Sequence, residues 1–140
     1  APTETIPSIM HISQMGKLPE VTNEADAARY YLQRTLDLAG HWHCFASDRR
    51  WGVATEDLLA DPDAVIASLG RWLQLSPELQ NQYQSHVMSA QPGGGDPTYS
   101  AHVRRIETRL PVPHCREWHG VPEELRTQCS AAHARLLEQF

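Results

Sequence analysis

Three consecutive glycines and two adjacent arginines in the second half of the chain are the residues best suited to bind an anion. Gly93, Gly94 and Gly95 form a loop whose N–H groups can approach a ligand closely, because glycine reaches positive φ and has no side chain. Arg104 and Arg105 follow, and guanidinium groups give charge-assisted hydrogen bonds to phosphate oxygens. The loop is not a P-loop, because no Gly-Lys-Ser or Gly-Lys-Thr ending supplies a lysine. The arginines could equally form a solvated basic surface.

Histidines and cysteines supply ligands for a rival chemistry, a tetrahedral zinc site. Cys129 and His133 would share one face of a helix at i, i+4 spacing. However, there is no Cys-x-x-Cys pair, and three distant segments would have to converge, so packing and surface roles are favoured. A Ser-His-Asp triad has no support, because no Gly-x-Ser-x-Gly sequence occurs. The candidate zinc ligands are His41, His43, Cys44, His114, Cys115, His119, Cys129 and His133.

The composition is typical of a soluble globular protein. Hydrophobic residues make up 41% of the 140 residues and charged residues 21%, which predicts one domain over residues 1–140. The net charge of −5 argues against a protein that coats nucleic acid or an anionic membrane. No apolar run approaches the roughly 20 residues that span a bilayer, and no signal peptide is recognised. Three widely spaced cysteines suit a reduced, cytoplasmic protein, with a Cys115–Cys129 disulfide as the alternative.

The secondary-structure signals in the sequence are strongest around Asp61, where a helix is predicted to begin. Asp61 can cap a helix, and Pro62 fits the first helical position. Residues 51–55, just before this acidic turn, predict a short strand. The helix over residues 62–74 should bury an apolar stripe formed by Val65, Ile66, Leu69, Trp72 and Leu73.

Three further helices are predicted. Residues 23–39 form one that Asn23 or Thr22 caps and Gly40 ends, and a cap-and-proline signal predicts a surface helix over residues 77–89. Pro122 begins the last helix. Residues 1–18 begin extended, or become helical at Pro7, and residues 98–110 are either a short helix or irregular. The expected buried positions are Ala25, Ala28, Leu32, Leu36 and Ala39 in the first helix, and Leu125, Cys129, Ala132, Leu136 and Phe140 in the last.

Two runs of sequence resemble a known family. EDLLADPDAVIASLGRWLQL, over residues 56–75, closely resembles the strand–turn–helix in the later half of sulfotransferases that use 3′-phosphoadenosine 5′-phosphosulfate (PAPS). LPEVTNEADAARYYLQRT, over residues 18–35, resembles bacterial members of that family less specifically. The resemblance implies the back half of an α/β, P-loop-like sulfotransferase fold. This chain itself would be predominantly α-helical, with one or two short parallel strands.

The resemblance also implies a role for Ser8. Many sulfotransferases have an arginine, then x-Pro, then a helix with a serine six residues after that proline, and the arginine and serine hold the nucleotide's 3′-phosphate. Pro2 and Ser8 have this spacing, and the matching arginine would fall one residue before Ala1. A helix-start serine that binds nothing is the alternative.

The glycine loop resembles the late G-x-GDP segment of bacterial sulfotransferases, through Gly93–Gly95 and the Asp-Pro pair that follows. A basic residue near this loop helps to hold the 3′-phosphate in many members, and here no basic residue precedes the glycines. The chain departs from the family pattern here, and Arg104 or Arg105 could substitute for that basic residue.

The family's sulfate-side loop and its catalytic base have no counterpart in this chain, so we expect it not to transfer sulfate alone. It would supply scaffold and part of the 3′-phosphate site for PAPS or adenosine 3′,5′-bisphosphate, with a hydroxyl or amine acceptor as the other substrate. The alternative is a non-catalytic helical scaffold that works through partners. Either case predicts self-association or a companion chain, because the surfaces that meet the missing half need cover.

Overall fold

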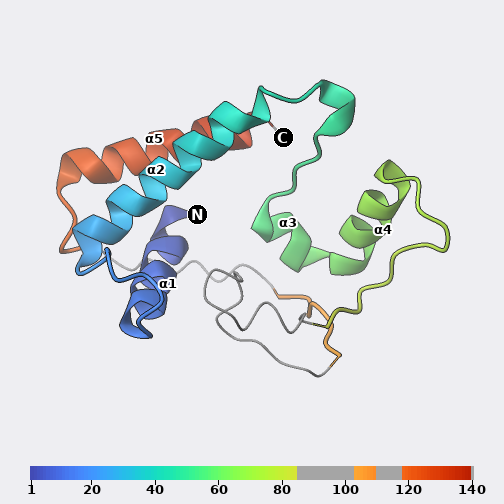
Figure 1. The fold of residues 1–140 in the computed structure, drawn as a ribbon, viewed down its shortest axis with the longest axis horizontal. Helices are drawn as coiled ribbons and strands as arrows, with labels where there is room; N and C mark the ends of the chain where they lie inside the picture. The colour runs from blue at the N-terminus through green and yellow to red at the C-terminus, as the bar shows by residue number, and fades with distance from the viewer. Residues whose placement is uncertain (85–102, 110–117, 140) are drawn as a thin grey trace. The chain divides into compact units, whose positions relative to one another are not determined.

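The computed structural model describes residues 1–84, 103–109 and 118–139. Helices account for 59% of this structure and strands for none of the residues it describes, so the predominantly helical character is confirmed (Figure 1). None of the described helices is long and apolar enough to cross a membrane. The elements are α1 (Pro2–Gln14), α2 (Glu24–Trp42), a 3-10 turn (Ser47–Arg49), α3 (Thr55–Ala60), α4 (Pro62–Trp72) and α5 (Glu123–Leu137).

The chain divides into two compact units, which are described separately. The first unit comprises Ala1–Arg50 and Pro113–Phe140, and the second comprises Trp51–Val112. The first unit therefore holds α1, α2 and α5, and the second holds α3 and α4. The expectation of a single domain over residues 1–140 stays a prediction.

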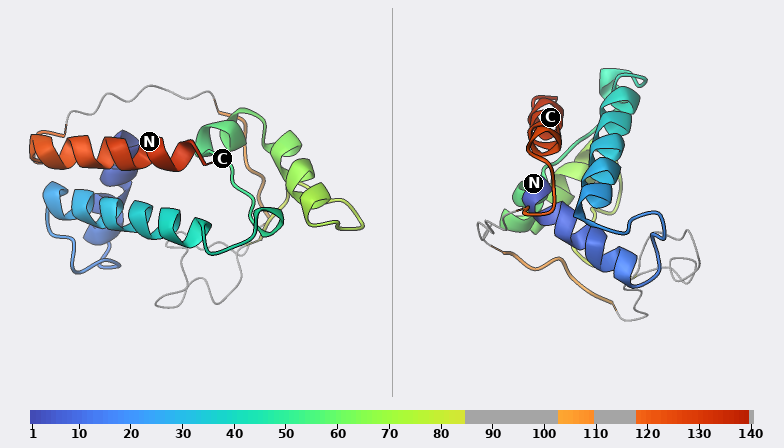
Figure 2. Two further views of the ribbon diagram at one scale, coloured as in Figure 1. Left: turned by 90° about the horizontal axis from the view of Figure 1, so that it is seen from above. Right: turned by 90° about the vertical axis from the view of Figure 1, so that its left-hand side faces the viewer.

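In the first unit, α2 and α5 lie side by side and run in the same direction, and α1 packs across them (Figure 2). The pairing is anchored by Cys129, whose thiol is fully buried and donates to the Ala28 carbonyl oxygen at 3.4 Å. Further along, the Tyr31 hydroxyl meets Nδ1 of His133 at 3.1 Å. The buried core consists of Ile6, Ile9, Val21, Ala27, Ala28, Tyr31, Trp118, Val121 and Cys129.

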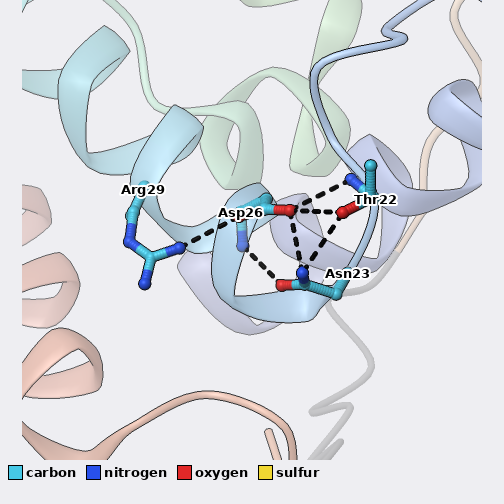
Figure 3. A network of polar contacts seen from close by, with 4 residues as sticks. All are labelled: Thr22, Asn23, Asp26 and Arg29. Atoms are coloured by element: carbon cyan, nitrogen blue, oxygen red, sulfur yellow. Dashed lines mark hydrogen bonds and ion pairs between the residues drawn. The ribbon is translucent and has the colours of Figure 1, made fainter.

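The start of α2 is fixed by a network of four polar side chains (Figure 3). Asn23 caps the helix, as predicted, because its side-chain oxygen accepts the Asp26 N–H at 2.9 Å. The Asp26 carboxylate accepts from the Thr22 hydroxyl at 2.7 Å and from the Asn23 amide at 2.8 Å, and it pairs with Arg29 at 3.0 Å. The hydrogen bonds from Thr22 lower the pKa of the Asp26 carboxyl.

The end and the buried face of α2 differ from the prediction. Gly40 does not end the helix, which continues to Trp42, because this glycine does not adopt the positive φ of a helix stop. The face that meets α5 is rotated, so Leu36 is 51% exposed although it was expected to be buried. Periodicity allowed several apolar stripes, and contacts with α5 select the one containing Ala27, Ala28, Tyr31 and Thr35.

The extended opening predicted for the chain is wrong, because α1 begins at Pro2. Pro2 occupies the first turn, where no N–H is needed. Pro7 lies inside the helix, where it cannot donate to the carbonyl four residues earlier. Burial of Ile6 and Ile9 on either side of Pro7 compensates for that missing bond. Gly16, at φ +73°, follows the end of α1, where glycine tolerates the left-handed conformation that stops a helix.

In the second unit, α4 begins as predicted, since Asp61 accepts the Ala64 N–H at 3.1 Å and Pro62 is at the first helical position. The strand predicted at residues 51–55 is wrong: residues 51–54 are irregular and Thr55 begins α3. Two causes favour the helix. Glu56 and Asp57 stabilise the first helical turn, and the described residues offer no neighbouring strand.

The helix predicted over residues 77–89 is wrong at residues 77–84, and residues 85–89 lie outside the described residues. Instead, Tyr83 pairs with Arg104 in an isolated antiparallel bridge. Asn81, one of few buried polar residues, donates to the Ile106 carbonyl oxygen at 2.8 Å and accepts its N–H at 2.9 Å. These contacts satisfy the backbone in an extended form and outweigh the weak helical pattern. Residues 103–109 are accordingly irregular, one of the two forms expected.

The apolar stripe of α4 is not buried as predicted. Val65, Ile66 and Leu69 are only half-buried, and Trp72 and Leu73 are 38% and 45% exposed. Within the described part of the second unit, the buried residues are Pro62, Gly70 and Asn81. In α5, by contrast, the predicted stripe is confirmed at Cys129, Ala132 and Leu136, with Leu125 partly buried and Phe140 outside the described residues.

Candidate functional site

An open hollow in the second unit gathers three arginines. It has a volume of about 460 Å³ and includes both arginines singled out from the sequence. Arg109 joins Arg104 and Arg105, and Glu107 is the one carboxylate among the lining residues. Arg105 already pairs with Asp63, and the two remaining arginines outnumber Glu107, so the lining favours an anion such as phosphate or sulfate. The remaining lining residues are Leu59, Tyr83 and Ile106.

Backbone pairing positions these arginines. The Tyr83 N–H donates to the Arg104 carbonyl oxygen at 2.9 Å, and the Arg104 N–H donates back to Tyr83 at 2.8 Å. The Arg109 N–H donates to the Leu59 carbonyl oxygen at 2.8 Å, which ties the far end of the segment to α3. The Asn81 pair of hydrogen bonds to Ile106 holds the middle. The hollow therefore depends on three separate tethers to residues 59–83.

The arginines differ in whether a carboxylate already pairs with their guanidinium group. Arg105 donates to both Asp63 carboxylate oxygens at 3.2 Å, and these two side chains are 61% and 66% exposed. Such an exposed ion pair contributes little stability and would yield readily to a phosphate. The Arg104 side chain is exposed and lies outside the ion pair between Arg105 and Asp63. Arg104 is therefore the guanidinium most ready to meet an anion.

Arg109 was missed at the level of sequence. No motif contains it, and residues 98–110 were left open between a helix and an irregular segment. The available signal was the spacing of Arg105, Glu107 and Arg109 at every second residue, which in an extended segment places side chains on one face. An extended interpretation of residues 103–109 would have brought Arg109 beside Arg105.

The other predicted site residues lie elsewhere. Ser8 is an exposed residue of α1 in the first unit, on a helix as the resemblance implies. Gly93, Gly94 and Gly95 lie outside the described residues. The structure thus brings Arg104 and Arg105 together in one hollow, and the roles of Ser8 and of the glycine loop stay predictions.

The described residues contain no cluster of side chains that could form the alternative zinc site. No group of three or more histidine, cysteine, aspartate or glutamate side chains comes together in the part of the chain that the structure describes. Cys129 is buried in the core, and this burial raises the pKa of its thiol and so disfavours the thiolate that binds zinc. Cys129 and Cys44 are both free, while His114 and Cys115 lie outside the described residues.

Comparison with known proteins yields no relative. No family model matches this chain, and neither the curated proteins nor the solved structures contain a match.

Proposed function

We propose that this chain is the back half of a PAPS-dependent sulfotransferase domain and that it holds the nucleotide's 3′-phosphate. The observation that carries the proposal is the hollow that gathers Arg104, Arg105 and Arg109, because Arg104 or Arg105 could substitute for the basic residue that many family members place at the glycine loop. The capped helix α4, within the run that most resembles the family, supports it further. Ser8, exposed on α1 of the first unit, is the phosphate contact that the family resemblance implies.

In the complete domain, a base from outside this chain removes a proton from the acceptor hydroxyl or amine, which attacks the sulfur of PAPS. The bond from sulfur to the bridging phosphate oxygen breaks, and adenosine 3′,5′-bisphosphate leaves. The contribution of this chain is to bind the nucleotide by its 3′-phosphate and so fix the position of the sulfate. Charge-assisted hydrogen bonds from Arg104 and Ser8 serve that purpose.

The test is thermal unfolding of the chain with adenosine 3′,5′-bisphosphate, compared with adenosine 5′-monophosphate, at low salt. A ligand that binds only the folded state adds about 2.7 kcal/mol at a hundredfold excess over Kd. We expect a rise in Tm with the bisphosphate and a much smaller one with the monophosphate, which lacks the 3′-phosphate.

Variants locate the phosphate contacts. Arg104→Gln should weaken binding about tenfold to a hundredfold, since a hydrogen bond to a charged group contributes about 1.5–3 kcal/mol. Ser8→Ala should weaken it less, without lowering the stability of the free protein, because alanine favours the helix. Arg71→Gln and Ser130→Ala are the matched controls on exposed helical positions. Equal shifts from both nucleotides, or no loss in Arg104→Gln, would refute the phosphate role.

A second candidate function is a non-catalytic scaffold that binds a partner. The exposed apolar side chains of the second unit favour it, notably Leu75 at 46% and Val103 at 64%. In that case sedimentation velocity should show a concentration-dependent dimer or larger species, and the bisphosphate should not raise Tm. A monomer at high protein concentration that binds the bisphosphate would dismiss this second candidate.

A further inference from the structure

Glu107 is the one carboxylate among the described residues that line the arginine hollow, and its side chain is exposed. In an extended segment, Arg105, Glu107 and Arg109 share one face, so the Glu107 side chain falls between those of two arginines. The ion pair described here nevertheless joins Arg105 to Asp63 rather than to Glu107. A carboxylate in a basic hollow weakens the attraction of the hollow for any anion, so charge alone does not describe what this site selects.

Hydrogen bonds fix the backbone on both sides of Glu107. Before it, the Asn81 side chain donates to the Ile106 carbonyl oxygen at 2.8 Å and accepts the Ile106 N–H at 2.9 Å. After it, the Arg109 N–H donates to the Leu59 carbonyl oxygen at 2.8 Å. The backbone that carries Glu107 is therefore placed before any anion arrives, which reduces the entropic cost of ordering the site.

The charges of the lining suit an anion with a single negative charge. Arg105 pairs with Asp63, and Arg104 and Arg109 beside Glu107 then leave one excess positive charge. A phosphate monoester has a second pKa of about 6, so near that pH it interconverts between a singly charged form with an O–H group and a doubly charged form without one. A sulfate monoester is also singly charged, but it is a strong acid and has no proton to donate at these pH values.

We propose that Glu107 makes the arginine hollow select a phosphate monoester over a sulfate monoester, by accepting a hydrogen bond from the O–H group of the phosphate. This hydrogen bond is charge-assisted, and the arginines bind the remaining phosphate oxygens. Against a sulfate, the same carboxylate is an acceptor that faces only acceptors and repels them. The inference rests on the proposed function, because PAPS carries both groups and this hollow is proposed to hold the 3′-phosphate. Glu107 then keeps the sulfate end of PAPS out of the phosphate site.

Phenyl phosphate and phenyl sulfate test this selection, because the two probes share a ring and differ in the anionic group. Each is titrated into the whole chain at low salt, and the backbone N–H signals of Tyr83 and Arg104 report binding in two-dimensional ¹H–¹⁵N NMR. At pH 5.5, we expect phenyl phosphate to bind about tenfold more tightly than phenyl sulfate, as one hydrogen bond to a charged group implies. At pH 7.5, where the phosphate has lost most of its proton, the ratio of the two affinities should be smaller.

The proton that changes this ratio belongs to the ligand. Histidine is the side chain that ordinarily titrates between pH 5 and 8, and the described lining of the hollow contains none. The other charged or titratable groups there are Arg104, Arg105, Arg109 and Tyr83, with Asp63 paired to Arg105. A ratio that depends on pH therefore reports the contact between the phosphate O–H group and Glu107.

Glu107→Gln isolates the effect of the carboxylate. The glutamine amide can donate to either anion, so this variant should bind phenyl sulfate about tenfold more tightly than the native chain does. The ratio between the two probes should then no longer rise as the pH falls. Glu78→Gln is the matched control, because it removes the same charge from an exposed residue of this unit outside the described lining. The control should keep the preference for phosphate.

The role of Glu107 is overturned if the two probes bind equally at pH 5.5, or if Glu107→Gln keeps the preference for phosphate. Either result leaves the proposed 3′-phosphate contact standing as long as phenyl phosphate binds in the hollow. If neither probe shifts the Tyr83 and Arg104 signals at millimolar concentration, the proposed phosphate contact and the role of Glu107 fail together.

Discussion

Replacing Asn81 by alanine should loosen the arginine hollow without disturbing the first unit. The Asn81 side-chain amide makes the two hydrogen bonds to the Ile106 backbone that a neighbouring strand would otherwise make. It donates to the Ile106 carbonyl oxygen at 2.8 Å and accepts the Ile106 N–H at 2.9 Å. Asn81 is only 7% exposed, so water does not take over these bonds easily. Alanine would therefore leave two backbone groups of Ile106 without partners.

The expected loss follows from two hydrogen bonds, each contributing about 0.5–1.5 kcal/mol, or about 1–3 kcal/mol together. Since 1.4 kcal/mol corresponds to a factor of ten, local opening of the Asn81–Ile106 contact should become about tenfold more frequent. Asn81→Asp should cost at least as much, because a carboxylate cannot donate to the Ile106 carbonyl oxygen and repels it.

Amide hydrogen exchange is the appropriate assay, because it reports local opening residue by residue. We expect the N–H groups of Ile106, Tyr83 and Arg104 to exchange about tenfold faster in Asn81→Ala, and those of α2 and α5 to exchange as before. Gln82→Ala, at an exposed neighbouring position, is the control and should change none of them. Unchanged protection at Ile106 would show that the side-chain contact does not hold this segment.

Three further predictions concern the first unit. Asn23→Ala removes the cap of α2 and should lower the free energy of unfolding by about 1 kcal/mol in urea titrations. Because the hydrogen bonds from Thr22 lower the Asp26 pKa below 3.8, Asp26 contributes stability above that pH and loses it as the pH falls through the lowered value. The loss should disappear in Asp26→Asn, and its persistence would implicate other carboxyls. Finally, an alkylating reagent at neutral pH should label exposed Cys44 readily and buried Cys129 only on unfolding, as followed by peptide mass spectrometry. Equal labelling in the folded protein would contradict the packing of α5 on α2.

Sequence signals that act within a few residues correctly predicted where α2 and α4 begin. Asn23 and Asp61 are caps because the interaction joins a side chain to a backbone N–H three residues away, and no tertiary contact is needed. The stripe of α5 was also predictable, since Cys129 and Leu136 recur with the helical period. The first unit is built largely of such local signals.

Tertiary contacts decided what the sequence left open or predicted wrongly. The pairing of Asn81 with Ile106 joins residues 25 positions apart, and no local sequence pattern predicts it. That pairing replaces the helix expected over residues 77–84, and Arg104 and Arg109 both line the resulting hollow. The buried face of α2 likewise depends on α5, more than 80 residues away along the chain, so Tyr31 replaced Leu36 as a core residue.

The exposed stripe of α4 links the two proposed functions. Its residues recur at helical spacing, and this amphipathic pattern normally indicates a face that packs against another element. Yet Trp72 and Leu73 remain exposed, although the same helix is correctly capped and correctly begun. The local structure of α4 is thus specified without a described partner for its apolar face.

Under the sulfotransferase proposal, the strands of the missing half would cover that face. Under the scaffold proposal, a companion chain or a second copy would do so. Because this face needs cover under both proposals, Trp72→Glu should abolish the concentration-dependent association of the chain in sedimentation velocity, and association that persists unchanged would show that the α4 stripe is not the contact surface.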